Sequence, residues 1–160
     1  MRPRLYRELV GWYRLLDPPA DHALHDAVVY MTSEPDLLAA ARTAFVHTRP
    51  GGAALFAPDS LRDTFRERSE LLEGDDGERA LRGLEWTWDP DPDDDTYTAE
   101  YALLLRDGSS MEVVHDRHVE GLFSKATWLR ILAEVGYGVE LALRPIGDGE
   151  VDEVFLCRRP

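Results

Sequence analysis

The sequence predicts a single domain of mixed α/β class, in which helices pack on a sheet and an antiparallel β insertion interrupts the chain. Three observations lead to this prediction. Apolar residues recur at helical spacing in three segments, they alternate with polar residues between about residues 84 and 123, and turn residues separate these segments. With 160 residues, 44% of them hydrophobic, the chain is long enough to bury one core.

Three segments have the pattern of helices. In residues 4–16 the apolar side chains have helical spacing, and the two prolines that follow end the segment. A second helix is predicted to begin after Ser33 as N-cap and to end at the "RPGG" of residues 49–52. The third helix, "KATWLRILAEV", follows Ser124 as N-cap and ends at Gly136, which can adopt the left-handed conformation of a C-cap.

Short apolar or alternating runs predict the strands. "AALFAPD" at residues 53–59 predicts a buried strand, whereas the charged residues 60–80 predict a partly helical surface segment that fades into a loop. Asp107 and Gly108 predict a hairpin turn. "DPDPDDD" at residues 89–95 lacks the ordered ligand spacing of a calcium loop and predicts an exposed acidic loop. The remaining predicted strands cover residues 84–89, 96–106, 110–121, 138–145 and 152–159.

Charge and cysteine content exclude several classes of protein. A formal net charge of −13 makes the surface repel phosphate backbones and anionic head groups, so we expect neither nucleic acid nor membrane as a partner. Cys157 is the only cysteine, which excludes an intramolecular disulfide, and its apolar neighbours predict a buried, inert thiol. No charged-then-apolar leader opens the chain and no apolar run approaches membrane length, so we expect a cytoplasmic protein.

The order of these segments resembles that of class I S-adenosylmethionine-dependent methyltransferases that act on small molecules. The resemblance covers nearly all of the chain. It implies a truncated, Rossmann-like sheet in which residues 1–22 form an N-terminal helix over the active site, 23–83 a partial α/β core, 84–123 the antiparallel insertion, and 124–160 the closing helix and strand pair. The similar segments are "YRELVGWYRLLDPPAD", "HDAVVYMT", "AFVHTRPGGAALFAPD", "LEWTWDPDP", "YALLLRDG", "HDRHVEGLF" and the final helix.

The methyl-donor half of that family has no counterpart in the sequence. The resemblance implies that a glycine-rich turn and a ribose-binding acid should lie between the opening helix and "HDAVVYMT", where glycines let the backbone approach the cofactor. Only Ala23 and Leu24 lie there, and no G-x-G-x-G-like turn occurs in the chain. Gly51 and Gly52 follow a helix and predict a helix end. We therefore expect no cofactor, with S-adenosylmethionine bound only if a partner rebuilds the site.

His25 and Asp26 lie where the resemblance implies that the acceptor pocket begins. In a methyltransferase such groups orient an acceptor or take its proton. The alternative is a structural role in capping the next helical segment. Residues 25–31 themselves are too short an apolar run to assign to strand or helix.

The segment "HDRHVEG" is the densest polar cluster. On a strand, Asp116, His118 and Glu120 share one face, while His115 and Arg117 point the other way. The resemblance implies that the His118 side faces the acceptor, and a solvated polar face is the alternative. A metal site requires both histidines to converge, which opposite faces of a regular strand prevent.

Aromatic residues at strand or helix spacing are usually core residues, and this is the default interpretation here. A lid role for the opening helix and an aromatic-lined acceptor pocket are the alternatives that the resemblance adds. The candidate catalytic residues are His25, Asp26, His118 and Glu120; the candidate substrate-binding residues are Tyr6, Trp12, Tyr13, Tyr30, Trp86 and Asp116.

Three functions remain open. In the first, the chain is a degenerate methyltransferase-fold protein that binds a small molecule or a partner. In the second, it is a cofactor-free enzyme, such as a cyclase or isomerase, with His118 and Glu120 among its acid–base groups. In the third, it is an active methyltransferase whose donor site is rebuilt by oligomerisation. The strand after "RPGG" would have an exposed edge in a truncated sheet, so we expect a homo-oligomer or a partner chain there.

Overall fold

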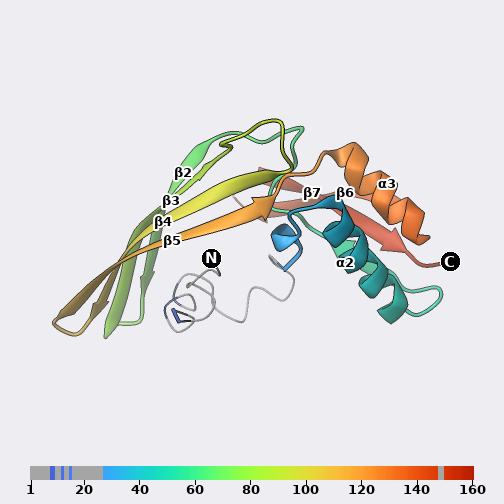
Figure 1. The fold of residues 1–160 in the computed structure, drawn as a ribbon. Helices are drawn as coiled ribbons and strands as arrows, with labels where there is room; N and C mark the ends of the chain where they lie inside the picture. Colours follow the sequence, from blue (N-terminus) through green and yellow to red (C-terminus); the bar gives the residue numbers. More distant parts are fainter. Residues whose placement is uncertain (1–7, 10–11, 13–14, 16–26, 148–149) are drawn as a thin grey trace. The chain divides into compact units, whose positions relative to one another are not determined.

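The computed structural model describes residues 8, 9, 12, 15, 27–147 and 150–160, and Figure 1 draws their helices and strands. Most of the helix predicted over residues 4–16 lies outside the described residues, as do Tyr6, Tyr13, His25 and Asp26. None of the described helices is both long and apolar enough to cross a membrane.

The described chain confirms the mixed α/β class. It forms the 3-10 helix η1 (Ala27–Tyr30), the helices α2 (Glu34–His47) and α3 (Lys125–Val135), and the strands β1 (Ala53–Phe56), β2 (Arg68–Asp75), β3 (Arg79–Trp88), β4 (Thr96–Asp107), β5 (Ser110–Gly121), β6 (Gly138–Gly147) and β7 (Glu150–Arg158). The undecided segment after Asp26 is therefore helical, as one 3-10 turn, at residues 27–30.

The strands form two antiparallel sheets, which corrects the Rossmann-like part of the prediction. One sheet has three strands in the order β1-β7-β6, and the other has four in the order β2-β3-β4-β5. The pairs β1–β7, β6–β7, β2–β3 and β3–β4 are all antiparallel. The described sheets thus contain no parallel pair of the kind that a Rossmann-like sheet requires.

The chain divides into two compact units, each with its own core. The first unit contains Arg66–Val119 and the described residues among the first 23; the second contains Leu24–Phe65 and Glu120–Pro160. In the second unit, α2 and α3 pack on the three-stranded sheet (Figure 1). Its core is formed by Leu37, Ala41, Phe56, Leu61, Phe123, Trp128, Ile131, Leu132, Tyr137, Phe155 and Cys157.

Local capping interactions define both helices of the second unit, as the sequence predicts. The Ser33 hydroxyl accepts a hydrogen bond from the Asp36 backbone N–H at the start of α2. At the other end of α2, the guanidinium of Arg159 donates to the carbonyl oxygens of Phe45 (2.8 Å) and Thr48 (2.6 Å). The Phe45 oxygen also accepts from the Thr48 backbone N–H (3.2 Å), so the arginine adds a second donor to the end of the helix. Gly136 ends α3 with φ of 111°, the left-handed conformation that favours glycine.

The first unit is a twisted four-stranded sheet with one buried face. Residues 60–80 do not form the predicted partly helical segment, because Arg68–Asp75 is strand β2 and pairs with β3 around a turn at Gly77. The predicted hairpin turn at Asp107 and Gly108 is confirmed between β4 and β5. The apolar core on the buried face consists of Leu9, Leu81, Ala99, Tyr101, Leu103, Leu105 and Val114, with Trp12 and Leu72 packed against it.

Candidate functional site

Strand β5 turns a row of polar side chains into the interior. Its side chains alternate between buried and exposed from Val114 onwards, as the period-two pattern predicts. Asp116 is 5% exposed, His118 0% and Glu120 6%, so all three are buried. The interpretation of this face as a solvated polar surface is therefore wrong. Burying an ionisable group costs folding free energy unless the group is paired, and such groups cluster at functional sites. This face is therefore the strongest candidate site.

His118 and Asp116 form a buried imidazole–carboxylate pair. Their Nε2 and Oδ2 atoms are 3.3 Å apart. The other oxygen of Asp116, Oδ1, accepts a hydrogen bond of 3.1 Å from the Arg117 backbone N–H. The strand itself thus fixes the carboxylate, and the carboxylate orients the imidazole. A histidine held in this way can accept or donate a proton in a fixed direction.

An aromatic ring contacts the imidazole from the neighbouring strand. The ring of Tyr101, on β4, lies with its centroid 4.8 Å from that of His118, and the two planes are inclined at 48°. Core packing is the default interpretation for strand aromatics, and Tyr101 is indeed part of the core cluster. Its contact with His118 was missed, because the pairing of β4 with β5 depends on the hairpin register. The signal was the short turn at Gly108, which fixes which residues of the two strands are neighbours.

The opposite face of β5 holds a separate ionic cluster. His115 Nε2 lies 2.6 Å from Glu100 Oε2, and the Arg117 guanidinium bonds the other oxygen of Glu100. Burial by itself would raise the pKa of Glu100, but the hydrogen bonds from Arg117 and His115 outweigh it, so this pKa lies below its ordinary value. His115 and His118 thus do not converge, as predicted. No cluster of three or more metal-ligating side chains occurs among the described residues.

The remaining candidates do not all come together at His118. Trp86 lies on the opposite face of the four-stranded sheet, where its indole Nε1 donates to Glu67 (2.9 Å) and its ring stacks on Trp88. Trp12 packs against the apolar core of the first unit, with the Arg79 guanidinium over its ring at 5.6 Å. Tyr30 is the last residue of η1, in the second unit.

Two threonines are buried polar residues that the sequence interpretation does not single out. Thr87 is 4% exposed and Thr98 5%. Thr87 lies opposite Ala99 in the β3–β4 register, and Thr98 lies opposite Trp88. Successive pairs of an antiparallel ladder point to alternate faces, so Thr87 is on the same face as Tyr101 and His118. The buried face of the sheet therefore changes from apolar at Leu103 and Leu105 to polar towards Thr87.

The fold is found in solved structures of methyltransferases. No known family profile matches the sequence, and no curated protein does. DesVI of Streptomyces venezuelae is similar, with a TM-score of 0.74 and 19% identity over 86% of this chain and 56% of that chain. CalS10 of Micromonospora echinaspora, an amino pentose methyltransferase solved with S-adenosylmethionine bound, is also similar. Its TM-score is 0.72 and its sequence identity 15%, over 86% of this chain and 56% of that chain. The sugar N-methyltransferase KedS8 from Streptoalloteichus has a TM-score of 0.67 and a sequence identity of 20%, over 85% of this chain and 53% of that chain.

These matches confirm the predicted resemblance at the level of the fold. The chain has part of the fold of small-molecule S-adenosylmethionine-dependent methyltransferases, and it spans about half the length of the structures it matches. Identities of 15–20% show a common fold and do not transfer an activity.

Proposed function

We propose that this chain is a methyltransferase-derived module that binds a small polar molecule at the buried face of β5 and does not bind S-adenosylmethionine by itself. The observation that carries the proposal is the His118–Asp116 pair, fully buried with the Tyr101 ring against the imidazole. These groups suit a ligand that offers an amine or a hydroxyl, because both the imidazole and the carboxylate of Asp116 can accept hydrogen bonds from it.

The ligand class follows from the same groups and from the similar structures. Two of those structures are described as an amino pentose methyltransferase and a sugar N-methyltransferase. An amino sugar carries both an ammonium group and several hydroxyls, so it matches a site with acidic and imidazole acceptors next to an aromatic ring. We therefore propose an amino sugar or a similar polyhydroxylated amine as the ligand.

The donor side of the proposal depends on the sequence. The sequence contains no G-x-G-x-G-like turn to approach a cofactor, and the described strands form no parallel pair of the kind that would be followed by a ribose-binding acid. Methyl transfer depends on holding the donor in line with the acceptor, which the acceptor side cannot do alone. The isolated chain is thus proposed to bind the acceptor class without transferring a methyl group.

The second candidate function is methyl transfer in a complex. It is favoured by the chain's spanning about half of the matched structures and by the position of β1 at the edge of its sheet, where β7 is its only neighbour among the described strands. An edge strand presents backbone groups that another strand can pair with. A different chain that adds strands beside β1 would supply the donor half, whereas a second copy has the same sequence and would have to build a new donor site.

Calorimetric titration of the purified chain tests the first function and distinguishes it from methyl transfer by an oligomer of this chain alone. S-adenosylmethionine and S-adenosylhomocysteine are expected to give no heat, whereas one or more of a set of amino sugars is expected to bind. Micromolar binding of S-adenosylmethionine would overturn the first function and favour the second. Failure of every amino sugar to bind would overturn the proposed ligand class.

Two variants test whether the ligand binds at the His118 face of β5 or at the His115 face. His118→Gln removes the buried imidazole, and is expected to weaken amino-sugar binding at least tenfold. His115→Gln is the matched control, because it removes a histidine from the same strand but from the exposed face, where the side chain is 71% exposed. Equal losses in both variants would contradict the assignment of the ligand to the His118 face. Circular dichroism of both proteins checks that the sheet is retained.

A further inference from the structure

The buried face of the four-stranded sheet carries a further polar side chain beside the His118 site, that of Thr87 on β3. Thr87 is 4% exposed. Its hydroxyl has no hydrogen-bond partner among the residues that the structure describes. Burying a hydroxyl without a partner costs folding free energy, and most buried polar groups in proteins are bonded. The presence of this hydroxyl therefore needs an explanation other than the stability of the fold.

The register of the sheet places Thr87 on the same face as the imidazole. Thr87 lies directly opposite Ala99 on β4, and Glu85 lies directly opposite Tyr101. Residues two positions apart on a strand share a face, so these four side chains point to the side on which the Tyr101 ring contacts His118. Because β4 lies between β3 and β5, the backbones of these two strands are about 10 Å apart, and Thr87 and His118 face a common strip from its two sides.

The side chain of the middle strand in this strip is small. Ala99 contributes only a methyl group, so no long side chain of β4 separates Thr87 from β5. None of Thr87, Ala99 and His118 is more than 4% exposed, which shows that water is largely excluded here. A hydrogen bond made where water is excluded discriminates between ligands, because water does not replace a partner that a ligand lacks.

The charges on this face indicate how an amino sugar would lie on it. The half-buried Glu85 lies opposite Tyr101, and Asp116 pairs with His118 on β5. An ammonium group is attracted to carboxylates and to the face of an aromatic ring, so it would lie near Tyr101. The hydroxyl of Thr87 is uncharged and can both donate and accept a hydrogen bond, so it suits a hydroxyl of the ligand.

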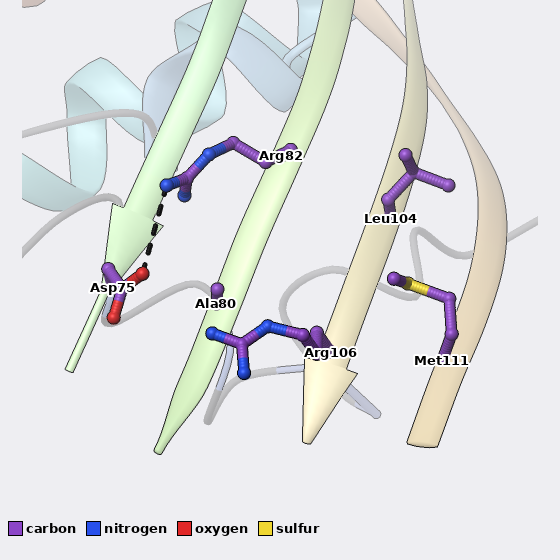
Figure 2. Close-up of a pocket in the computed structure, with 6 residues that line it drawn as sticks. All are labelled: Asp75, Ala80, Arg82, Leu104, Arg106 and Met111. Carbon is purple, nitrogen blue, oxygen red and sulfur yellow. Dashed lines mark ion pairs between the residues drawn. The ribbon is translucent and has the colours of Figure 1, made fainter. Parts of the chain in front are cut away.

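The other face of the sheet has a hollow, but its charges do not suit an amine. The hollow has a volume of about 170 Å³ and is lined by Asp75, Ala80, Arg82, Leu104, Arg106 and Met111 (Figure 2). Arg82 pairs with Asp75 and Glu73, whereas Arg106 has no acidic partner among the described residues. The guanidinium of Arg106 would repel an ammonium group. An amino sugar is therefore expected on the Thr87 face.

We propose that Thr87 is a specificity-determining residue of the ligand site, and that its hydroxyl bonds a hydroxyl of the amino sugar whose amine lies near Tyr101. The inference rests on the proposed function, and it assigns one side of the same site to β3. A ligand without that hydroxyl would leave the threonine unpaired in the complex, and would therefore bind less tightly.

The test compares D-glucosamine with three derivatives that each lack one of its hydroxyls, by calorimetric titration. Wild-type protein is expected to bind one of the derivatives about tenfold less tightly than glucosamine. Thr87→Val keeps the shape of the side chain without the hydroxyl, so it should bind that derivative and glucosamine equally well. Thr87→Ser retains a hydroxyl and should restore the preference.

Thr98→Val is the matched control. Thr98 is 5% exposed, and its hydroxyl likewise lacks a partner within the described part of the chain. It lies opposite Trp88, one position along the ladder from Thr87 and Ala99, so it points to the other face of the sheet. Its substitution should leave the preference for glucosamine unchanged. A preference that also persists in Thr87→Val would overturn this inference and leave the proposed function intact.

Urea unfolding of the free proteins separates ligand recognition from a structural role. Because the hydroxyl has no partner in the described fold, Thr87→Val should unfold at the same urea concentration as the wild type or at a higher one. A lower midpoint would show that the hydroxyl stabilises the fold, and would overturn the inference whatever the sugars do. Failure of the wild type to bind any of the four sugars would overturn the proposed function, and this inference with it.

Discussion

Replacing Gly83 by alanine tests how closely β3 and β4 approach on the buried face of the four-stranded sheet. Gly83 lies opposite Leu103 in the register. A Cβ atom at Gly83 would lie 2.6 Å from Leu103 Cδ2 and 2.9 Å from the Ala102 carbonyl oxygen. Both distances are shorter than van der Waals contact. Leu103 is fully buried, so its methyl group has no solvent to move into.

The size of the effect follows from two opposed terms. Overpacking in a well-packed core costs about 1–3 kcal/mol. Alanine regains about 0.5–1 kcal/mol relative to glycine, because it loses less backbone entropy on folding. The net expectation for Gly83→Ala is a loss of about 0–2.5 kcal/mol of unfolding free energy. Leu103→Ala alone removes a fully buried side chain and should cost about 2–5 kcal/mol.

The double variant is the decisive protein. With Leu103 shortened to alanine, the new methyl group at position 83 occupies space that the leucine has left. The double variant should therefore be more stable than the sum of the single variants predicts, by about 1 kcal/mol. Urea unfolding of the wild type, both single variants and the double variant, followed by circular dichroism, measures this coupling.

Gly138→Ala is the control for the glycine substitution itself. Gly138 also lies on a strand, but the nearest atom to its added Cβ would be 3.8 Å away, which is ordinary contact. It should be neutral or slightly stabilising. Additivity of the Gly83 and Leu103 effects within about 0.5 kcal/mol would refute the steric argument, as would an increase in stability on Gly83→Ala alone.

Three further predictions concern single groups. Because the hydrogen bonds from Arg117 and His115 lower the pKa of Glu100, its ionised form stabilises the fold above the unfolded pKa, near 4.3, and this stability is lost as the pH falls through the folded pKa. Glu100→Gln should thus flatten the decline of unfolding free energy from pH 6 to 3, and an unaltered slope would contradict it. Burial raises the pKa of Cys157 to about 12, so a thiol reagent at pH 8 should label it only after unfolding; rapid labelling of native protein would show that the thiol is accessible. Ser124→Ala removes the N-cap of α3 and should cost about 1 kcal/mol by urea unfolding, a value near zero being inconsistent with the cap.

The helices could be predicted because their signals are local. Ser33 and Ser124 accept hydrogen bonds from backbone groups three residues away, and Gly136 adopts its left-handed conformation within the last turn of α3. Such contacts do not depend on the rest of the fold. Strand β2 was missed because its signal is not local. The sequence of β2 has no clear alternation of apolar and polar residues, because it is mostly charged and its two leucines, Leu71 and Leu72, are adjacent and point to opposite faces. Its conformation depends instead on pairing with β3.

The candidate site was only partly predictable for a similar reason. The alternation in β5 placed Asp116 and His118 on one face and His115 on the other, and this is confirmed. Their burial depends on side chains from distant parts of the sequence, as does the contact with Tyr101. Composition instead favoured a solvated face for a cluster of this polarity. The sequence did not predict the exposed apolar residues on the other face of this sheet, because they come from four strands and each strand contributes only a few of them: Leu71, Leu84, Trp86, Leu104, Met111, Val113 and Val119.

The alternation of β5 constrains how this protein can evolve. Along residues 115–119 the chain contributes in turn to an ionic cluster outside and to the imidazole–carboxylate pair inside. Substitutions on either side are independent, since neighbouring residues point apart. Insertion or deletion of one residue after the turn at Gly108 would not be tolerated in this way, because it would exchange the buried and exposed residues of β5. Arg117 or Val119 would then point into the interior. We therefore expect the length of this hairpin arm to be held fixed in descendants of the gene even where the identities of its exposed residues drift.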